Sequence, residues 1–181
     1  MTYQVSVPPL GGEQGSPPMM LELAIPNHPD LIEALGRLAI AYTHLELVWR
    51  YTVKTLSGLS IEKALDATNK ERTADTRQRV RRLFLEKKPT ETETSQLDAL
   101  IGNASRLTSK RNDYLHSAWS VSPAGMPIRK SEDHSWGPAP TKEEIDRVAS
   151  ELLSLGKEIN HERLYGFIDA VARRVTPPLV P

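Results

Sequence analysis

The sequence predicts an all-α fold, a four- to five-helix up-and-down bundle, and three observations carry this prediction. Apolar residues recur at alternating three- and four-residue steps over three long segments. Gly and Pro gather in the segments between them, and almost nothing has the alternation of a strand. A chain of 181 residues is long enough for one domain with its own core. We expect an irregular arm over residues 1–26, one helical domain over 27–175 and a Pro-rich tail over 176–181.

The arm is rich in Pro and Gly and has little periodicity, so we expect it to lie outside the core and to be free to pack on a partner. The first helix follows, because Asn27 and Pro29 suit a helix start and Gly58 suits a helix end. The apolar positions of this helix are Leu31, Leu35, Leu38, Tyr42, Leu45, Trp49, Val53 and Leu56.

Shorter signals place the middle of the chain. Ser60 is a candidate N-cap for a short helix to about Thr68, and Thr73 opens another helix. Val80, Leu83 and Phe84 form the expected buried edge of that second helix. A long helix then runs from about Thr92 to Ala118, with a stripe of Leu97, Leu100, Ile101, Ala104, Leu107, Tyr114 and Leu115.

The last helix follows a segment of a different kind. Pro and Gly recur between Trp119 and Pro140, which predicts a loop or a short hairpin. Thr141 followed by Glu144 is a capping-box pattern, so a helix is expected to begin there. Its apolar positions continue to about Arg174 and are Ile145, Val148, Leu152, Leu155, Ile159, Leu164, Phe167 and Val171.

Composition excludes several functional classes. The 23 basic and 23 acidic residues balance, so overall charge gives no nucleic-acid signature. The absence of Cys excludes disulfides and thiolate sites and fits a reducing cytoplasm, where we expect the protein to reside. No window has the length and apolarity of a membrane span. Glu158 and His161 form one Glu-x-x-His pair, but a di-iron bundle needs two. We expect no metal and no cofactor.

The most chemical feature is an arginine on the apolar stripe of the fourth helix. Arg111 stands where a core residue is expected, and His116 follows five positions later. A guanidinium stays charged at ordinary pH, so a buried one needs a carboxylate, a ligand phosphate or an opening to solvent. The spacing alone is weak, since Arg129 with His134 and Arg37 with His44 are similar. Only Arg111 precedes a short polar residue, Asn112, within a predicted helix, and we expect the loop pair of Arg129 and His134 to be dispensable.

This motif resembles that of the HEPN superfamily, helical bundles with an Arg, usually a following polar residue, and a His four to six residues later. Arg111, Asn112 and His116 match that pattern, and Tyr42, Leu45 and Glu46 resemble an element of the family's opening helix. The resemblance spans about residues 27–119. Some members carry a Tyr two residues after the His as a modification target, and Ala118 occupies that place here.

The resemblance implies a metal-independent endoribonuclease of toxin or defence type, or an inactive relative. It also implies a homodimer with two motifs facing one cleft, RNA as the substrate and an antitoxin as a candidate partner. His116 would transfer the proton of the ribose 2′-hydroxyl or of the leaving oxygen, Arg111 would stabilise the phosphate charge, and Asn112 would position either group. Lys110, Arg77 and Arg81 are candidate RNA contacts, the last two in a run from Lys70 to Lys88 with eight basic and three acidic residues.

The same residues also have a purely structural interpretation. In it, Arg111 pairs with Glu46 or another carboxylate, and His116 caps the end of its own helix. Tyr114 and Trp119 are expected to be core residues rather than base-stacking platforms. A solvated helix face is the common explanation of a basic run. The alternative function is a non-catalytic helical module for dimerisation or partner binding.

Overall fold

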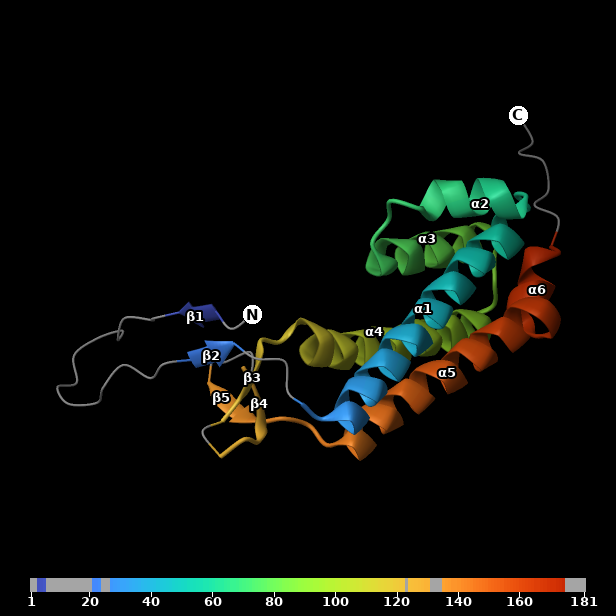
Figure 1. Ribbon diagram of the computed structural model, residues 1–181. Coiled ribbons are helices and arrows are strands. Elements are labelled where there is room, and N and C mark those ends of the chain that lie inside the picture. The colour runs from blue at the N-terminus through green and yellow to red at the C-terminus, as the bar shows by residue number, and fades with distance from the viewer. Residues whose placement is uncertain (1–2, 6–20, 24–26, 123, 131–134, 175–181) are drawn as a thin grey trace, which may run out of the picture.

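The computed structural model describes residues 3–5, 21–23, 27–122, 124–130 and 135–174. Six helices lie within this part of the chain, and Figure 1 shows the long ones packed side by side, with the strands gathered at one end. The helices are α1 (Pro29–Ser57), α2 (Ile61–Thr68), α3 (Thr73–Glu86), α4 (Glu91–His116), α5 (Lys142–Tyr165) and α6 (Phe167–Ala172). The strands are β1 (Tyr3–Val5), β2 (Leu21–Leu23), β3 (Trp119–Val121), β4 (Pro127–Lys130) and β5 (Trp136–Pro138).

The long helices α1 and α5 form the centre of the bundle and run parallel. Arg37 near the start of α1 contacts Asp146 near the start of α5, and Tyr51 near the end of α1 lies under Arg163 near the end of α5. Helix α4 runs antiparallel to α5, since Arg106 contacts Glu151 and the later residue Tyr114 lies close to the earlier Glu144. The helical bundle predicted from the sequence is therefore present.

One continuous core holds these helices together. Its largest buried side chains come from α1, α3, α4, α5 and α6, and all of them except Ile168 lie on the predicted apolar stripes. They are Trp49, Phe84, Leu38, Leu45, Leu56, Leu97, Leu107, Ile145, Leu152, Ile159 and Ile168. Burial of this apolar area is the main stabilising contribution.

Local signals set several of the helix ends. Pro29 lies in the first turn of α1, and Gly58 ends that helix in the left-handed conformation, at φ 69°. Ser60 caps α2 by accepting a hydrogen bond from the backbone N–H of Lys63. Capping boxes begin both α4, from Thr90 with Glu93, and α5, from Thr141 with Glu144.

The segment before α5 is a three-stranded antiparallel sheet in the order β3-β4-β5, which is more strand than the predicted loop or short hairpin. In the register, Trp119 of β3 faces Arg129 of β4, and Arg129 faces Gly137 of β5. Strands of three or four residues carry too little alternation to be recognised in the sequence. The sheet follows α4 directly and lies at its C-terminal end (Figure 1).

Two further predictions need correction. The predicted last helix is interrupted at Gly166, where α5 ends and α6 begins, so Leu164 is exposed and Ile168 is buried. A Cβ at Gly166 would lie 1.8 Å from Glu162 Oε2, which accepts a hydrogen bond from the backbone N–H of Phe167. The arm is not wholly irregular, because β1 and β2 pair as an antiparallel ribbon. The rest of the arm and the tail 176–181 lie outside the described residues.

Candidate active site

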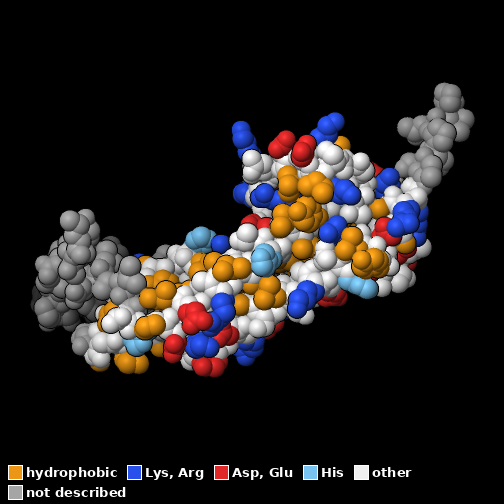
Figure 2. Space-filling view, turned by 45° about the vertical axis from the view of Figure 1, so that its right-hand side comes forward, with side chains coloured by type: hydrophobic (Ala, Val, Ile, Leu, Met, Phe, Trp, Pro, Cys, Tyr) orange, Lys and Arg blue, Asp and Glu red, His pale blue; other side chains and the backbone are white. Residues whose placement is uncertain are grey.

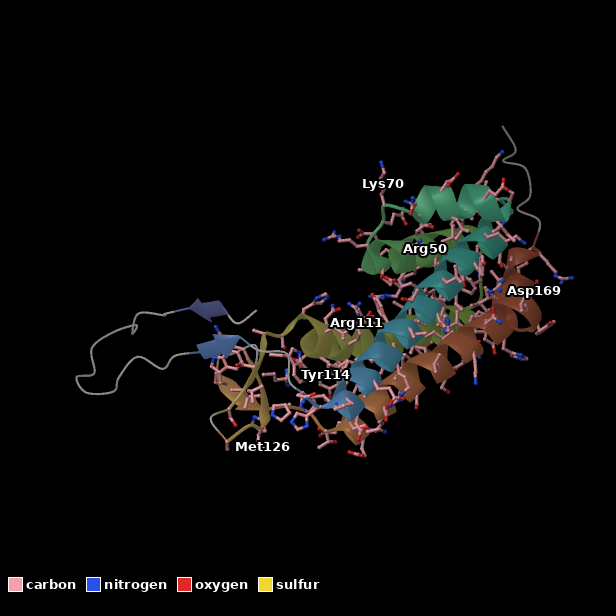
Figure 3. The ribbon with its side chains drawn as sticks, viewed as in Figure 1. Arg50, Lys70, Arg111, Tyr114, Met126 and Asp169 are labelled. Atoms are coloured by element: carbon pink, nitrogen blue, oxygen red, sulfur yellow. The ribbon has the colours of Figure 1, made fainter. Side chains whose placement is uncertain are left out.

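The side chains of the Arg-x4-His motif meet at the C-terminal end of α4. Arg111 Nη1 lies 3.1 Å from His116 Nε2 and donates to Asn112 Oδ1 at 2.9 Å. His116 and Asn112 are exposed, and Arg111 is half-buried. Figure 3 shows Arg111 and Tyr114 on the part of α4 that adjoins the sheet. Because a guanidinium only donates, Nε2 takes the acceptor role in this contact.

An aromatic platform holds Arg111. Its guanidinium carbon lies 4.2 Å from the ring centroid of Tyr42 on α1, within the range of a cation–π contact. Arg111 Nε is buried against this surface and has no hydrogen-bond partner among the described residues. Arg111 can therefore occupy the apolar stripe because its guanidinium stacks on the Tyr42 ring. Its terminal Nη1 contacts His116 and Asn112.

Tyr42 is itself fixed by a polar chain that includes Glu46. The Tyr42 hydroxyl donates to Thr73 Oγ1 at 3.0 Å, and the Thr73 hydroxyl donates to the Glu46 carboxylate. Glu46 thus supports the platform under Arg111, and the alternative in which Glu46 forms an ion pair with Arg111 is wrong. Because residues four positions apart lie on one face of a helix, Tyr42 and Glu46 lie on the same face of α1.

The arginine that lies in the core is Arg77. Its side chain is only 6% exposed, and its Nη1 lies 3.4 Å from Thr108 Oγ1. Burial lowers the pKa of the Arg77 guanidinium, and the nearby Tyr42 hydroxyl and Glu46 carboxylate oppose this effect. The prediction that Arg77 contacts an RNA backbone is therefore wrong, because its charge is turned inward towards Glu46. Only tertiary packing decides this, since Arg77 is one of several arginines in its run.

Three of the seven other basic residues in the run, Arg72, Arg79 and Arg81, form ion pairs with carboxylates. Arg81 forms a two-pronged ion pair with Asp98 of α4 at 2.7 and 3.0 Å, so it is engaged within the bundle rather than free for RNA. Arg79 pairs with Glu71. On the face drawn in Figure 2, Lys and Arg side chains are interspersed with Asp and Glu. The arrangement favours the interpretation of the run as an ordinary charged helix surface.

The remaining candidate residues, Lys110, Tyr114 and Trp119, lie in different environments. Lys110 is exposed beside Arg111, which leaves it available to a bound polyanion. Tyr114 and Trp119 are partly buried and pack against the core, in agreement with the structural interpretation of both. Burial raises the pKa of the Tyr114 phenol, and the charge of Glu144 adds to this effect.

Sequence reasoning missed the role of Arg129. Its Nη1 donates to Asp113 Oδ1 at 2.7 Å, and its guanidinium carbon lies 5.7 Å from the ring centroid of Tyr114. The sequence-based expectation that Arg129 is dispensable did not anticipate this contact with the helix that carries the motif. The contact depends on the register of the sheet, for which the sequence holds no signal. His134 lies outside the described residues.

No helix in the described part of the chain is both long and apolar enough to cross a membrane. Within the same residues, no group of three or more His, Cys, Asp and Glu side chains is arranged to hold a metal ion. In comparisons with known proteins, no family model matches the chain, and no curated protein or solved structure matches it either.

Proposed function

We propose that the protein is a metal-independent endoribonuclease in which Arg111 and His116 form the catalytic pair. The observation that carries the proposal is the 3.1 Å contact between Arg111 Nη1 and His116 Nε2 at an exposed helix end. The pair combines a permanent cation with an imidazole that can accept or donate a proton, which is what phosphodiester cleavage by a neighbouring hydroxyl requires. The motif's resemblance to the HEPN superfamily supports the same chemistry.

In the proposed reaction, a phosphate of the RNA takes up the terminal N–H groups of Arg111. His116 Nε2, which accepts from Arg111 in the free protein, is then released to take the proton of the ribose 2′-hydroxyl. The 2′-oxygen forms a bond to phosphorus while the bond from phosphorus to the 5′-oxygen breaks. The 5′-oxygen leaves with a proton supplied by solvent, and the product is a 2′,3′-cyclic phosphate.

The neighbours of the pair have supporting roles in this proposal. The Tyr42 ring keeps the guanidinium plane fixed, since it lies 4.2 Å from the guanidinium carbon. Asn112, one turn before His116, orients the guanidinium through the 2.9 Å hydrogen bond from Arg111 Nη1 to its amide oxygen. Lys110, exposed on the same turn, contacts the RNA backbone. RNA is the substrate because DNA lacks the attacking hydroxyl.

The decisive experiment is cleavage of a mixed single-stranded RNA pool in the presence of EDTA. We expect the wild type to cleave RNA to cyclic-phosphate ends and to leave the matching DNA intact. His116→Ala should cleave at least about 100-fold more slowly with an unchanged circular dichroism spectrum, the loss expected for a missing general base. Full activity of His116→Ala, or cleavage that needs a divalent cation, would contradict the proposal.

We further propose that the protein works as a homodimer that joins the α4 ends of two copies, because the resemblance to the HEPN superfamily implies two motifs that face one cleft. The expected result in analytical ultracentrifugation is a dimer at micromolar concentration. A monomer at all concentrations would rule out the shared cleft.

A specific surface also favours the alternative, a non-catalytic interaction module. A hollow of about 430 Å³ lies between α1 and α5, bordered by Ile40, Leu153, Ala149 and Arg37. Ile40 is 60% exposed and Leu153 is 40% exposed, which is high for large apolar side chains. If the purified protein cleaves no RNA, partner binding through this face becomes the favoured function.

A further inference from the structure

The sheet closes the end of α4 that carries His116. The last four backbone carbonyls of an α-helix lack partners within the helix. Helix α4 ends at His116, and its C-cap, Ser117, has an extended backbone with φ −65° and ψ 148°. The left-handed glycine that commonly completes a helix end is thus not used here. The Asp113 carbonyl accepts a hydrogen bond from the Ser117 hydroxyl next to the helix end, whereas the Tyr114 carbonyl needs a donor from the following segment.

Two side chains of the sheet reach this helix end. Trp119 Nε1 donates to the Tyr114 carbonyl at 3.0 Å. Arg129 Nη1 lies 3.5 Å from the Asp113 carbonyl, in addition to its 2.7 Å ion pair with the Asp113 carboxylate. Trp119 and Arg129 face each other across β3 and β4, so their side chains lie on the same face of the sheet. The cross-strand pair therefore covers the helix end as a unit.

Arg129 holds this last turn at more than one point. Its Nη1 also lies 3.4 Å from Ser117 Oγ, and its guanidinium is stacked towards the Tyr114 ring. Asp113 and Tyr114 precede His116 in the turn, and Ser117 directly follows it. The Arg129 side chain is 19% exposed and that of Asp113 is 27% exposed. Partial shielding from water makes such a pair more effective than an open surface ion pair.

We propose that Arg129 is a positioning residue that holds His116 opposite Arg111. The catalytic meaning of this inference rests on the proposed ribonuclease function. His116 is the terminal residue of α4, so the 3.1 Å contact between its Nε2 and Arg111 Nη1 persists only while the last turn stays wound. Arg129 secures that turn from a strand outside the helix, and the sheet thereby becomes part of the site.

Arg174 offers a matched control at the opposite end of α4. Its Nη1 and Nη2 lie 3.0 and 2.6 Å from the Glu93 carboxylate in the first turn of the helix. Arg174→Ala therefore removes an arginine–carboxylate pair of the same kind from the same helix, far from His116. Arg129→Lys keeps the positive charge but loses the planar guanidinium, which contacts the Asp113 carboxylate and the Tyr114 ring at the same time.

The first measurement does not depend on catalysis. Hydrogen exchange of the backbone amides of residues 114–117 should be at least about tenfold faster in Arg129→Ala, because the last turn then opens more often. The imidazole signals of His116 in NMR spectra should shift in the same variant. Arg174→Ala should leave both quantities as in the wild type. Unchanged exchange and unchanged His116 signals in Arg129→Ala would overturn the proposal, and so would equal changes in the two alanine variants.

The second measurement is the rate of RNA cleavage. In Arg129→Ala we expect kcat to fall at least about tenfold while KM changes less than about twofold, because the reacting group is misplaced but the RNA contacts remain. Arg129→Lys should recover part of the loss, and Arg174→Ala should match the wild type. If Arg129→Ala does not fold, Asp113→Asn removes the same ion pair with nearly the same shape and must give the expected changes. A wild type without ribonuclease activity would refute the proposed function, while exchange and NMR would still decide whether Arg129 holds His116.

Discussion

The backbone groups at the two ends of α4 find their partners in different ways. The difference separates contacts made by neighbouring residues from contacts made by another element. The backbone of the N-terminal end is capped locally, since Thr90 and Glu93 form a capping box within four residues, and Arg174 adds an ion pair with the Glu93 side chain. The C-terminal end has a local contact from the Ser117 hydroxyl and further contacts from Trp119 and Arg129 of the sheet. The proposed chemistry lies at the second end. A helix end that depends on distant side chains is easier to move, and it also lets another element tune the site.

The largest expected effect tests the chemical end directly. Arg111→Ala should reduce RNA cleavage at least about 100-fold, because the variant lacks the positive charge that stabilises the phosphate. Arg111→Lys should recover little, since an ammonium group cannot stack flat on Tyr42 and approach the phosphate with two N–H groups. Single-turnover cleavage rates provide the measurement. Near wild-type rates for Arg111→Ala would remove this end of α4 from the mechanism.

The next effect tests the N-terminal end. Thr90→Ala removes the hydroxyl that accepts from the Glu93 backbone N–H at 3.2 Å, which should lower the free energy of unfolding by about 1 kcal/mol. Thr94→Ala, one turn later in α4, serves as the control and should cost less than about 0.5 kcal/mol. Urea denaturation measures both variants. The kcat of Thr90→Ala should be unchanged, and a marked fall in kcat would mean that the two ends are coupled.

A smaller effect compares the charges near the two ends. Lys110→Ala should weaken RNA binding about equally for all sequences and reduce the slope of log affinity against log salt by about one unit. Arg81→Ala should leave both unchanged, because Arg81 is already paired with Asp98. Fluorescence anisotropy at several salt concentrations gives both slopes. A larger effect for Arg81 would show that RNA displaces the ion pair.

The smallest effect concerns acid stability at the N-terminal end. The Arg174 guanidinium, followed by the backbone N–H of Thr90, holds the pKa of Glu93 below its usual value. A carboxylate whose pKa is lower in the folded state stabilises the protein above its unfolded pKa, and this contribution is lost as pH falls through the folded pKa. The melting temperature should therefore decrease from about pH 5 to about pH 3, and the decrease should be smaller in Arg174→Ala. Equal decreases in both proteins would assign the effect to other carboxylates.

The same contrast explains how much of the fold could be predicted. The long helices follow from apolar periodicity, and the starts of α2 and α5 follow from Ser60 and from Thr141 with Glu144, because these signals lie within a few residues. A short hairpin was one of the two expectations for the segment before α5, but the third strand of that sheet, the β1–β2 ribbon and the interruption at Gly166 were not predicted. Their conformations depend on contacts with other segments, and Gly166 lies inside an apolar pattern that continues on both sides.

The candidate site was predictable to the same extent. Arg111, Asn112 and His116 share one helix, so their meeting follows from the spacing of that helix. The burial of Arg77 and the contact between Arg129 and Asp113 did not follow, because each depends on which element packs against which. Among many arginines in the sequence, only the folded structure distinguishes a core residue, a positioning residue and a surface residue.

The parallel pairing of α1 and α5 has a consequence for synthesis on the ribosome. Arg37 and Asp146, which join these two helices, are 109 positions apart, so the centre of the bundle cannot close until most of the chain has emerged. Such long-range pairing slows folding relative to bundles made of neighbouring helices. Arg129 is also translated after the α4 motif. A growing chain that already contains Arg111 and His116 therefore still lacks the contacts that fix them. The proposed RNA cleavage is thus delayed until translation of the domain is nearly complete.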